Sequence, residues 1–477
     1  CVLPSDVQTR GNVLLLIIIL GIGGSFQMGY HITGLSSPSP FIQRFINSSW
    51  YDRHEEPPSP QTITMIWSLI VSMYAVGGLF GAISIKFVSG MLGRKKAVIC
   101  NSLVAVVAAG IMLTSKGAKS YEMIIVARSL FGYSAGLGQS THLMYLGEIS
   151  LRKFRGIVTL TFAIFTSLGK LSGQFFGLSE IFGREELWEI VLCVPAILSV
   201  VQVLVLPFLP EAPRYLFIEK GDDKACKKAL QTLWGDGDYK EEMDEMLAEQ
   251  AAIEAAPPKS LLQLLWDRTV RWQLTTMAVI CCCNQLSGMS AVRTEYLYSD
   301  TFSFDIFLNT GIPRDKIRYV TLGLGLCEII TSISCVSTRH PLLLLPVYMV
   351  SIFSYNVVFL QDSGYWVPYI ATVLIILFII FFCGGPGMCS THHIGETVTH
   401  ETKPVLSRVY LPSPLSQNAL NSYCFVLFAC VSLLGCLYTF FLLPETKGKT
   451  LMEISEEFKA IIVCGKLFKP REVETKL

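Results

Sequence analysis

The sequence predicts an all-α membrane protein, and three observations lead to this fold class. Of the 477 residues, 51% are hydrophobic and only 16% are charged, whereas about 25% are charged in an average soluble protein. About eleven apolar runs are long enough to cross a bilayer core, which takes roughly 20 residues in a helix. Lys and Arg (38) nearly balance Asp and Glu (37), so we expect no basic surface for nucleic acid.

The first half of the chain contains six of these runs and is predicted to form an N-terminal transmembrane bundle at residues 1–210. The runs lie at residues 13–35, 65–85, 97–113, 123–146, 157–178 and 187–209. A polar, charge-rich segment follows at 211–271. It has helical patterns at 222–234 and 239–256, the second closed by Pro257 and Pro258. We expect this segment to be a cytoplasmic helical linker.

The second half contains five runs and is predicted to form a C-terminal transmembrane bundle at residues 272–443. These runs lie at residues 272–292, 320–336, 342–360, 367–387 and 420–443. The remaining residues, 444–477, are expected to form a cytoplasmic tail.

Charged clusters at the ends of the spans predict which side of the membrane they face. Basic residues gather after the second span (from Arg94), after the fourth (around Arg155) and after the last (from Lys447). Because cytoplasmic ends carry an excess of Lys and Arg, both the N-terminus and the tail are predicted to be cytoplasmic. The loop after the first span then lies outside, where Asn47 in Asn-Ser-Ser is a candidate N-glycosylation site. These signals predict a multi-pass membrane glycoprotein. We expect its location to be the plasma membrane.

Two local motifs recur in the two halves, as expected for a carrier built from a duplicated bundle. In the first motif an acid precedes a base: Glu148 before Arg155, and Glu396 before Lys403. The spacing is about two helical turns, so acid and base can meet at the cytoplasmic end of a span.

The second motif is a Pro-Glu pair where a span ends. It contains Glu211, with Arg214 three residues later, in the first half and Glu445 in the second. Proline at a membrane exit ends one helix and can start another, with an acid at the new N-terminus. Ordinary helix-end charge clusters are the alternative interpretation of both motifs.

Seven motifs together point to a family. They are Gly93-Arg94-Lys95, Arg128 with Gly132 and Gly136, Glu148 with Arg155-Gly156, Pro210-Glu211-Ala212-Pro213-Arg214, Gln285-Leu286-Ser287-Gly288, Gly385-Pro386-Gly387 and Pro444-Glu445-Thr446-Lys447-Gly448. As a set they resemble the sugar porters of the major facilitator superfamily, and most of all the vertebrate facilitative hexose transporters of the fructose and urate type. The resemblance covers nearly the whole chain.

The resemblance implies the major facilitator fold, in which two six-helix bundles rock about a central site. It implies facilitated diffusion of a hexose, fructose or glucose, with the hexose and the lipid bilayer as partners and no cofactor. It also implies that ion pairs at the ends of the spans break and form during transport. The gating and ion-pair candidates are Arg94, Arg128, Glu148, Arg155, Glu211, Arg214, Glu396, Lys403 and Glu445.

A site for an uncharged hexose must replace lost hydration with amide and hydroxyl groups, while aromatic faces cover the ring. Polar residues inside apolar spans are the candidates: Gln174 in the fifth span, then Asn284, Gln285 and Ser290 in the seventh. Carboxamides suit such a site because each offers a donor and an acceptor. The resemblance implies that Gln174 and Gln285 bind the sugar and that Tyr30 lies near it. Hydrogen bonding between helices is the alternative role.

Gly385, Pro386 and Gly387 fall late in an apolar span, where a missing Pro N–H and flexible glycines allow a gate to bend. A static kink is the alternative. Just beyond, Thr391 is a further candidate for substrate contact. Glucose-preferring members of the family usually carry Trp at this position, so the resemblance favours fructose.

Charges within the membrane are costly and usually functional. Glu328 lies in the eighth span, and Lys170 lies in the fifth, close to Gln174. Each is a candidate coupling or anion-sensing group, or a member of a structural pair. His31 stands where proton-coupled sugar carriers typically place Asp, which favours uncoupled diffusion. We expect this histidine on a wet face.

The second half departs from the family pattern. Residues 397–418 are polar and contain Pro404, Pro412 and Pro414, which a lipid-facing helix does not accommodate easily. We therefore expect the eleventh span to be missing. Either residues 397–418 form a re-entrant segment protected by protein, or the sequence is a splice variant or a faulty gene model that lacks a coding segment. The alternatives to hexose transport are a truncated, non-transporting sugar-binding membrane protein and a carrier of urate.

No enzymatic activity is predicted from the sequence. The adjacent pair His392-His393 does not have metal-ligand spacing, so no metal site is expected, and no Gly-rich phosphate loop follows a strand. The oligomeric state stays open.

Overall fold

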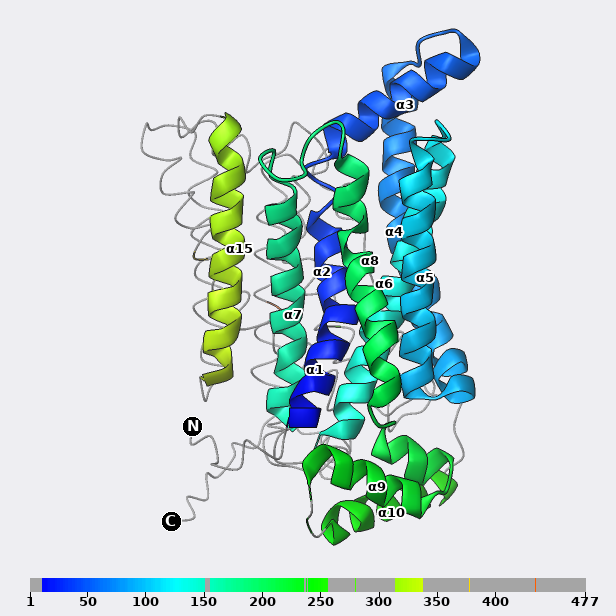
Figure 1. The fold of residues 1–477 in the computed structure, drawn as a ribbon, viewed down its shortest axis with the longest axis vertical. Coiled ribbons are helices and arrows are strands. Elements are labelled where there is room, and N and C mark those ends of the chain that lie inside the picture. The colour runs from blue at the N-terminus through cyan, green and yellow to red at the C-terminus, as the bar shows by residue number, and fades with distance from the viewer. Residues whose placement is uncertain are drawn as a thin grey trace.

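The computed structural model describes residues 11–150, 155–235, 237, 239–255 and 314–337, with the single positions 279, 377 and 434. Within this part of the chain the elements are helices and turns, and no strand is present. The predicted all-α fold class is confirmed. The helices of the first half stand side by side in one bundle, with α15 next to α7 (Figure 1). Their bounds are α1 Gly11–Gly23, α2 Ser25–Thr33, α3 Ser39–His54, α4 Pro60–Leu92, α5 Arg94–Ser115, α6 Tyr121–Ile149, α7 Arg155–Phe176, α8 Trp188–Val205, η2 Leu206–Phe208, η3 Tyr215–Glu219, α9 Asp223–Trp234, α10 Lys240–Ala255 and α15 Arg314–Ser337.

The first predicted span is bent. Helix α1 ends at Gly23 and α2 begins at Ser25, so the direction changes at Gly24. A side chain at Gly24 would press on the Cβ atom of His142 and on the backbone of α6. Glycine therefore allows the span to lie against α6 at the bend, which the hydropathy of a continuous run at 13–35 does not reveal.

Helix α6 lies in the middle of the bundle, where it packs against both α4 and α5. A Cβ atom at Gly132 would collide with the backbone of Tyr74 in α4. Small residues at this contact let the two backbones come together, as is common between membrane helices. The central position of α6 also explains how it keeps Arg128 and Glu148 buried within an apolar bundle.

Four spans among the described residues are both long and apolar enough to cross a membrane: Asn12–Thr33, Pro60–Leu92, Arg94–Ser115 and Trp188–Phe208. Their outward faces carry large exposed hydrophobic side chains, such as Phe80 and Phe87 of α4, which suit contact with lipid. Helices α6 and α7 are also long but carry more polar residues. Those of α6 are mostly buried against neighbouring helices, and in α7 Ser167 and Lys170 are buried.

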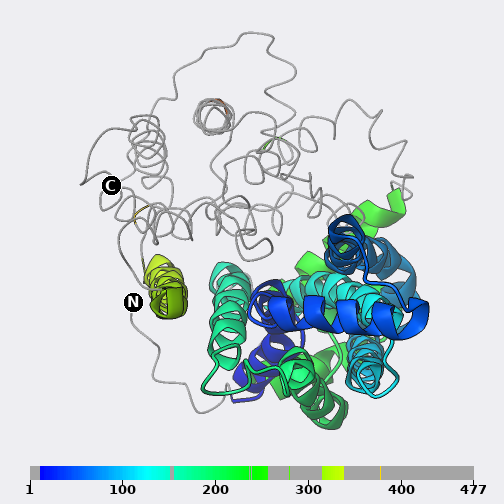
Figure 2. The ribbon, with the colours of Figure 1, turned by 90° about the horizontal axis from the view of Figure 1, so that it is seen from above.

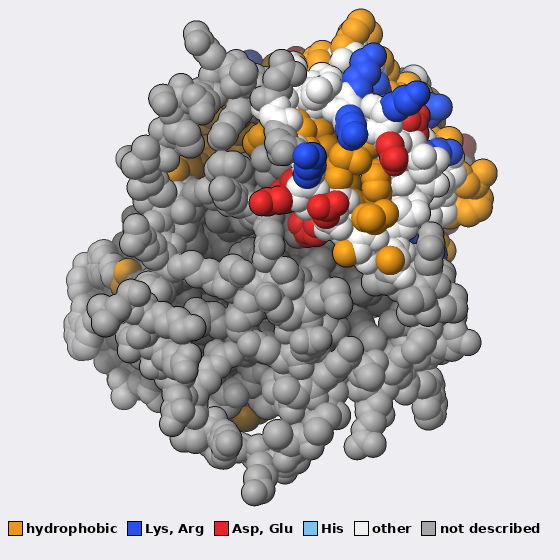
Figure 3. Space-filling model, turned by 90° about the horizontal axis from the view of Figure 1, so that it is seen from below, with side chains coloured by type: hydrophobic (Ala, Val, Ile, Leu, Met, Phe, Trp, Pro, Cys, Tyr) orange, Lys and Arg blue, Asp and Glu red, His pale blue; other side chains and the backbone are white. Residues whose placement is uncertain are grey.

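The two ends of the bundle differ. At one end, here called the α3 end, α3 lies across the tips of the other helices (Figure 2). At the opposite end, here called the linker end, α9 and α10 pack beneath the bundle (Figure 1). Trp234 Nε1 of α9 donates to the Ile149 carbonyl at 3.0 Å, and Asn12 Nδ2 donates to the Thr232 carbonyl at 2.8 Å. Viewed from the linker end, Lys, Arg, Asp and Glu side chains gather on this face (Figure 3).

Candidate functional site

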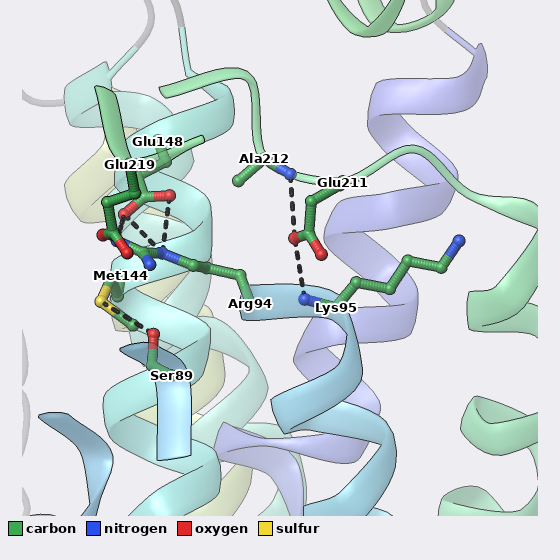
Figure 4. A network of polar contacts seen from close by, with 8 residues as sticks. All are labelled: Ser89, Arg94, Lys95, Met144, Glu148, Glu211, Ala212 and Glu219. Atoms are coloured by element: carbon green, nitrogen blue, oxygen red, sulfur yellow. Dashed lines mark hydrogen bonds and ion pairs between the residues drawn. The ribbon is translucent and has the colours of Figure 1, made fainter. Parts of the chain in front are cut away.

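An ion-pair cluster lies at the linker end of the bundle (Figure 4). Gly93 separates α4 from α5 with a φ of 84°, a backbone conformation that favours glycine. This turn places Arg94 at the start of α5, facing Glu148 in the last turn of α6. Arg94 Nε donates to both carboxylate oxygens at 3.0 Å, and Nη2 donates to Oε1 at 2.8 Å. The side chains are 5% and 2% exposed, so this is a buried, charge-assisted pair.

The linker supplies a second layer to the cluster. Arg94 Nη2 also lies 2.6 Å from Oε1 of Glu219, whose side chain is 40% exposed. The guanidinium carbon of Arg94 lies 4.6 Å from the centre of the Tyr215 ring, within cation–π range. Both residues belong to η3, a π-helical turn. The sequence interpretation missed them. Glu219, eight residues after Glu211 of the Pro-Glu motif, was the residue that the sequence could have indicated. Its position could not be predicted from sequence spacing, because a π-helix does not follow the α-helical register.

Glu211, from the second repeated motif, caps the start of α5. Its Oε1 accepts hydrogen bonds from the backbone N–H groups of Lys95 at 2.9 Å and Ala212 at 3.1 Å. The Lys95 side chain turns the other way, and its Nζ donates to the carbonyls of Pro207 at 2.6 Å and Leu209 at 2.7 Å. An acid at the start of a helix and a cation at the end of a helix both interact favourably with the helix dipole.

Arg214 is also buried at the linker end, and its Nη2 lies 3.3 Å from Oε1 of Glu245 in α10. The structure therefore brings together Arg94, Glu148, Glu211 and Arg214 of the predicted set. Arg155 begins α7.

Arg128 stands apart from this cluster. It lies 20 residues before Glu148 on α6, which corresponds to about 30 Å along the helix. The buried guanidinium carbon lies 4.6 Å from the centre of the Tyr74 ring. Its Nε and Nη1 atoms make no hydrogen bond within the described residues. Arg128 thus takes part in a cation–π contact near the α3 end, away from the other gating candidates.

Gln174, the predicted sugar ligand in the fifth span, lies at the contact of α7 with α15. A Cβ atom built at Gly325 of α15 would lie 2.5 Å from Gln174 Oε1. This oxygen is buried and has no hydrogen-bond partner within the described residues. On the same contact, Lys170 Nζ lies 2.5 Å from Oε1 of Glu328. The two intramembrane charges found in the sequence therefore form a pair.

Tyr30 and His31 are both buried in the first bundle. The Tyr30 hydroxyl donates to the Val191 carbonyl at 2.7 Å, so this group is engaged between α2 and α8. The His31 ring lies 4.4 Å from the Phe131 ring and 6.1 Å from the Tyr74 ring. The expectation of a wet-face histidine is wrong, because His31 points from α2 towards these aromatic rings and is 2% exposed.

Asn47 is exposed on α3, and the α3 end carries several surface ion pairs. Lys119 Nζ lies 2.7 Å from Asp52, and hydrogen bonding to this carboxylate raises the pKa of Lys119. Arg53 and Glu122 form a similar pair at 2.5 Å. These contacts hold α3 against the start of α6.

The remaining candidates lie outside the described residues, and so do residues 397–418, where the eleventh span is expected to be missing. They are Asn284, Gln285, Ser290, Gly385, Pro386, Gly387, Thr391, Glu396, Lys403 and Glu445. Within the described residues, no group of His, Cys, Asp and Glu is arranged to hold a metal ion.

Comparison with known proteins places these features in context. Residues 16–458 match the family model described as "Sugar (and other) transporter". The chain is 37% identical to the Mus musculus "Solute carrier family 2, facilitated glucose transporter member 9", over 94% of this chain and 86% of that protein. It is 35% identical to member 5 of Rattus norvegicus, over 95% of this chain and 94% of that protein. It is 37% identical to member 11 of Homo sapiens, over 94% and 93%.

Solved structures share the fold. The major facilitator superfamily proton:xylose symporter XylE bound to 6-bromo-6-deoxy-D-glucose gives a TM-score of 0.77 at 16% identity, covering 94% of this chain and 99% of that chain. A partially occluded inward-open XylE from E. coli gives 0.67 at 14% identity, covering 91% and 100%. At this identity the similarity concerns the fold alone, and the predicted major facilitator fold is confirmed.

Proposed function

The chain belongs to the sugar transporter family, and we propose on this basis that it carries a hexose, fructose or glucose, by facilitated diffusion. The observation that carries the proposal is its 35–37% identity to facilitated glucose transporters over nearly the whole chain. A carrier of this kind passes a neutral solute down its gradient and needs no bond to be broken. We therefore propose a carrier rather than an enzyme, without a cofactor.

The side chain of Gln174 supports the proposed substrate. Its buried Oε1 atom has no hydrogen-bond partner within the described residues, and buried polar atoms are normally satisfied. A sugar hydroxyl can donate to this oxygen. We propose that Gln174 binds the hexose together with Gln285 and Asn284 of the seventh span, with Ser290 and Thr391 as further contacts.

The ion-pair cluster suits one step of alternating access. We propose that the linker end faces the cytoplasm and that Arg94, Glu148 and Arg214 hold it closed on the side of the first bundle. Glu396 and Lys403 are proposed to do the same for the second bundle. As the carrier opens inward, contacts between the two sets break, and they form again when it opens outward.

This orientation places the α3 end outside the cell. The proposal therefore includes a plasma-membrane location, a cytoplasmic N-terminus and tail, and glycosylation of exposed Asn47. Removal of glycans from intact cells should lower the apparent mass of the wild-type chain and leave Asn47→Gln unchanged.

Uptake measurements test the proposed function. The wild-type chain should restore uptake of labelled fructose or glucose to hexose-transport-deficient cells, with surface delivery measured by biotinylation. Gln174→Ala should raise KM for the hexose, whereas Gln61→Ala, at an exposed position in the first turn of α4, should not. Surface delivery without uptake contradicts hexose transport. Sugar binding without flux would instead identify a non-transporting sugar-binding protein.

A further inference from the structure

A buried ion pair connects the fifth and eighth spans. Lys170 Nζ lies 2.5 Å from Oε1 of Glu328, and the side chains are 9% and 10% exposed. Ser167 Oγ donates to the same oxygen at 3.2 Å and lies 3.4 Å from Ser332 Oγ. Lys170 and Ser167 belong to α7, whereas Glu328 and Ser332 belong to α15. One polar network thus joins a helix of the first half to a helix of the second.

The pair lies beside the proposed sugar ligand. Gln174 follows Lys170 by one helical turn on α7, and Gly325 precedes Glu328 by three residues on α15. Residues at these spacings share a helix face. The close approach of Gln174 Oε1 to Gly325 agrees, because it places Gln174 against the same helix that Lys170 contacts.

Pairing matters because an isolated charge is expensive in a low-dielectric interior. A lone ammonium at this position would attract anions, and a lone carboxylate would repel them and bind a proton. Together the two groups present no net charge to a neighbouring ligand. Such an environment suits a solute that has many hydroxyls and no charge.

We infer that Lys170 and Glu328 form a charge-compensated pair that sets the preference of this carrier for uncharged over anionic substrates. Glu328 is then a specificity-determining residue, because its carboxylate cancels the charge of Lys170 that would otherwise attract anions. The inference rests on the proposed function and adds a determinant of substrate charge to the same site.

Other titratable groups near α7 are the same in every variant of the test. Among the described residues, ring contacts place two of them against α7: Tyr30 of α2 lies 6.4 Å from Phe176, and His142 of α6 lies 5.8 Å from Phe162. Both make hydrogen bonds within the first bundle. Cys327 precedes Glu328 on α15. A pH effect that differs between variants of the pair therefore comes from the pair.

The first arm of the test measures charge preference. Labelled fructose and labelled urate, a monoanion of similar size, are compared in proteoliposomes containing purified protein. Glu328→Gln removes the negative charge and keeps Lys170, so the ratio of urate to fructose flux should rise by about tenfold, which corresponds to about 1.4 kcal/mol. The control is Glu185→Gln, which removes a carboxylate paired with Arg44 at 3.2 Å on the exposed surface and should leave the ratio unchanged.

The second arm measures pH dependence. In Lys170→Met, the Glu328 carboxyl loses its ammonium partner and is expected to bind a proton before the carrier can turn over. Fructose flux should then fall as the pH rises from 5.5 to 8, by up to about tenfold per pH unit. The double variant Lys170→Met/Glu328→Gln has neither charge, so its pH profile should match that of the wild type.

Two outcomes overturn the inference: an unchanged flux ratio in Glu328→Gln, or a wild-type pH profile in Lys170→Met. If the single variants fail to fold, the exchanged pair Lys170→Glu/Glu328→Lys provides the decision. It should keep the wild-type flux ratio, and a folded exchange with an altered ratio refutes the inference. A wild type without hexose flux contradicts the proposed function instead. The pair is then tested by thermal unfolding. As the pH falls, Lys170→Met should become more stable relative to the double variant Lys170→Met/Glu328→Gln, because its unpaired Glu328 carboxylate binds a proton in the folded state.

Discussion

Replacing Arg94 with methionine should destabilise the protein much more than replacing its exposed partner Glu219 with glutamine. The substitution removes three hydrogen bonds of 2.8–3.0 Å to Glu148, whose side chain is 2% exposed. Removing one partner of a buried pair costs about 3–5 kcal/mol. Glu219→Gln also removes a carboxylate that pairs with Arg94, but the Glu219 side chain is 40% exposed. Exposed pairs contribute only about 0.2–1 kcal/mol.

Unfolding of the purified protein in detergent, followed by the fluorescence of buried Trp67 and Trp188, measures these differences. The double variant Arg94→Met/Glu148→Gln should recover part of the loss, with a coupling free energy of about 0.5–3 kcal/mol. Equal losses for Arg94→Met and Glu219→Gln would refute the argument from burial. So would simple additivity in the double variant.

Three further predictions concern packing and reactivity. Gly325→Ala should displace the flexible Gln174 side chain and raise KM for the hexose by roughly 2- to 12-fold, the value of one hydrogen bond, with unchanged thermal stability. Gly132→Ala meets rigid backbone and should cost about 1–3 kcal/mol on unfolding, whereas Gly110→Ala, which meets nothing within 4 Å, should cost nothing. Burial raises the pKa of Cys226 to about 11. The folded protein should therefore resist maleimide at this position at pH 8, and mass spectrometry should find the adduct only after unfolding.

The spans of the first half were predictable because lipid imposes a length and a composition on them. The partners of charged side chains on different helices could not be predicted in the same way. Spacing along the chain suggested Arg155 as a partner of Glu148, and the Arg155 side chain lies outside the described residues. It did not suggest Arg94, which lies 54 residues away in sequence and donates to Glu148. Two adjoining helix ends meet at this point, and only their packing determines which charges face each other.

The contacts of buried polar residues could not be predicted from the sequence either. Lys170 and Glu328 were conspicuous in sequence because charges in a membrane are costly, yet their pairing depends on how α7 meets α15. His31 was expected on a wet face. Its sequence neighbours do not indicate which side of α2 packs against Phe131 of α6.

The side chain of Lys95 joins parts of the carrier that we expect to move as a unit. By donating to the carbonyls of Pro207 and Leu209, it holds the start of α5 to the exit of α8. Trp234 likewise holds α9 to the last turn of α6 through the Ile149 carbonyl. When the first bundle tilts, α9 should therefore move with it. A spin label on the exposed surface of α9 would report each transport cycle from outside the membrane, without touching the sugar path.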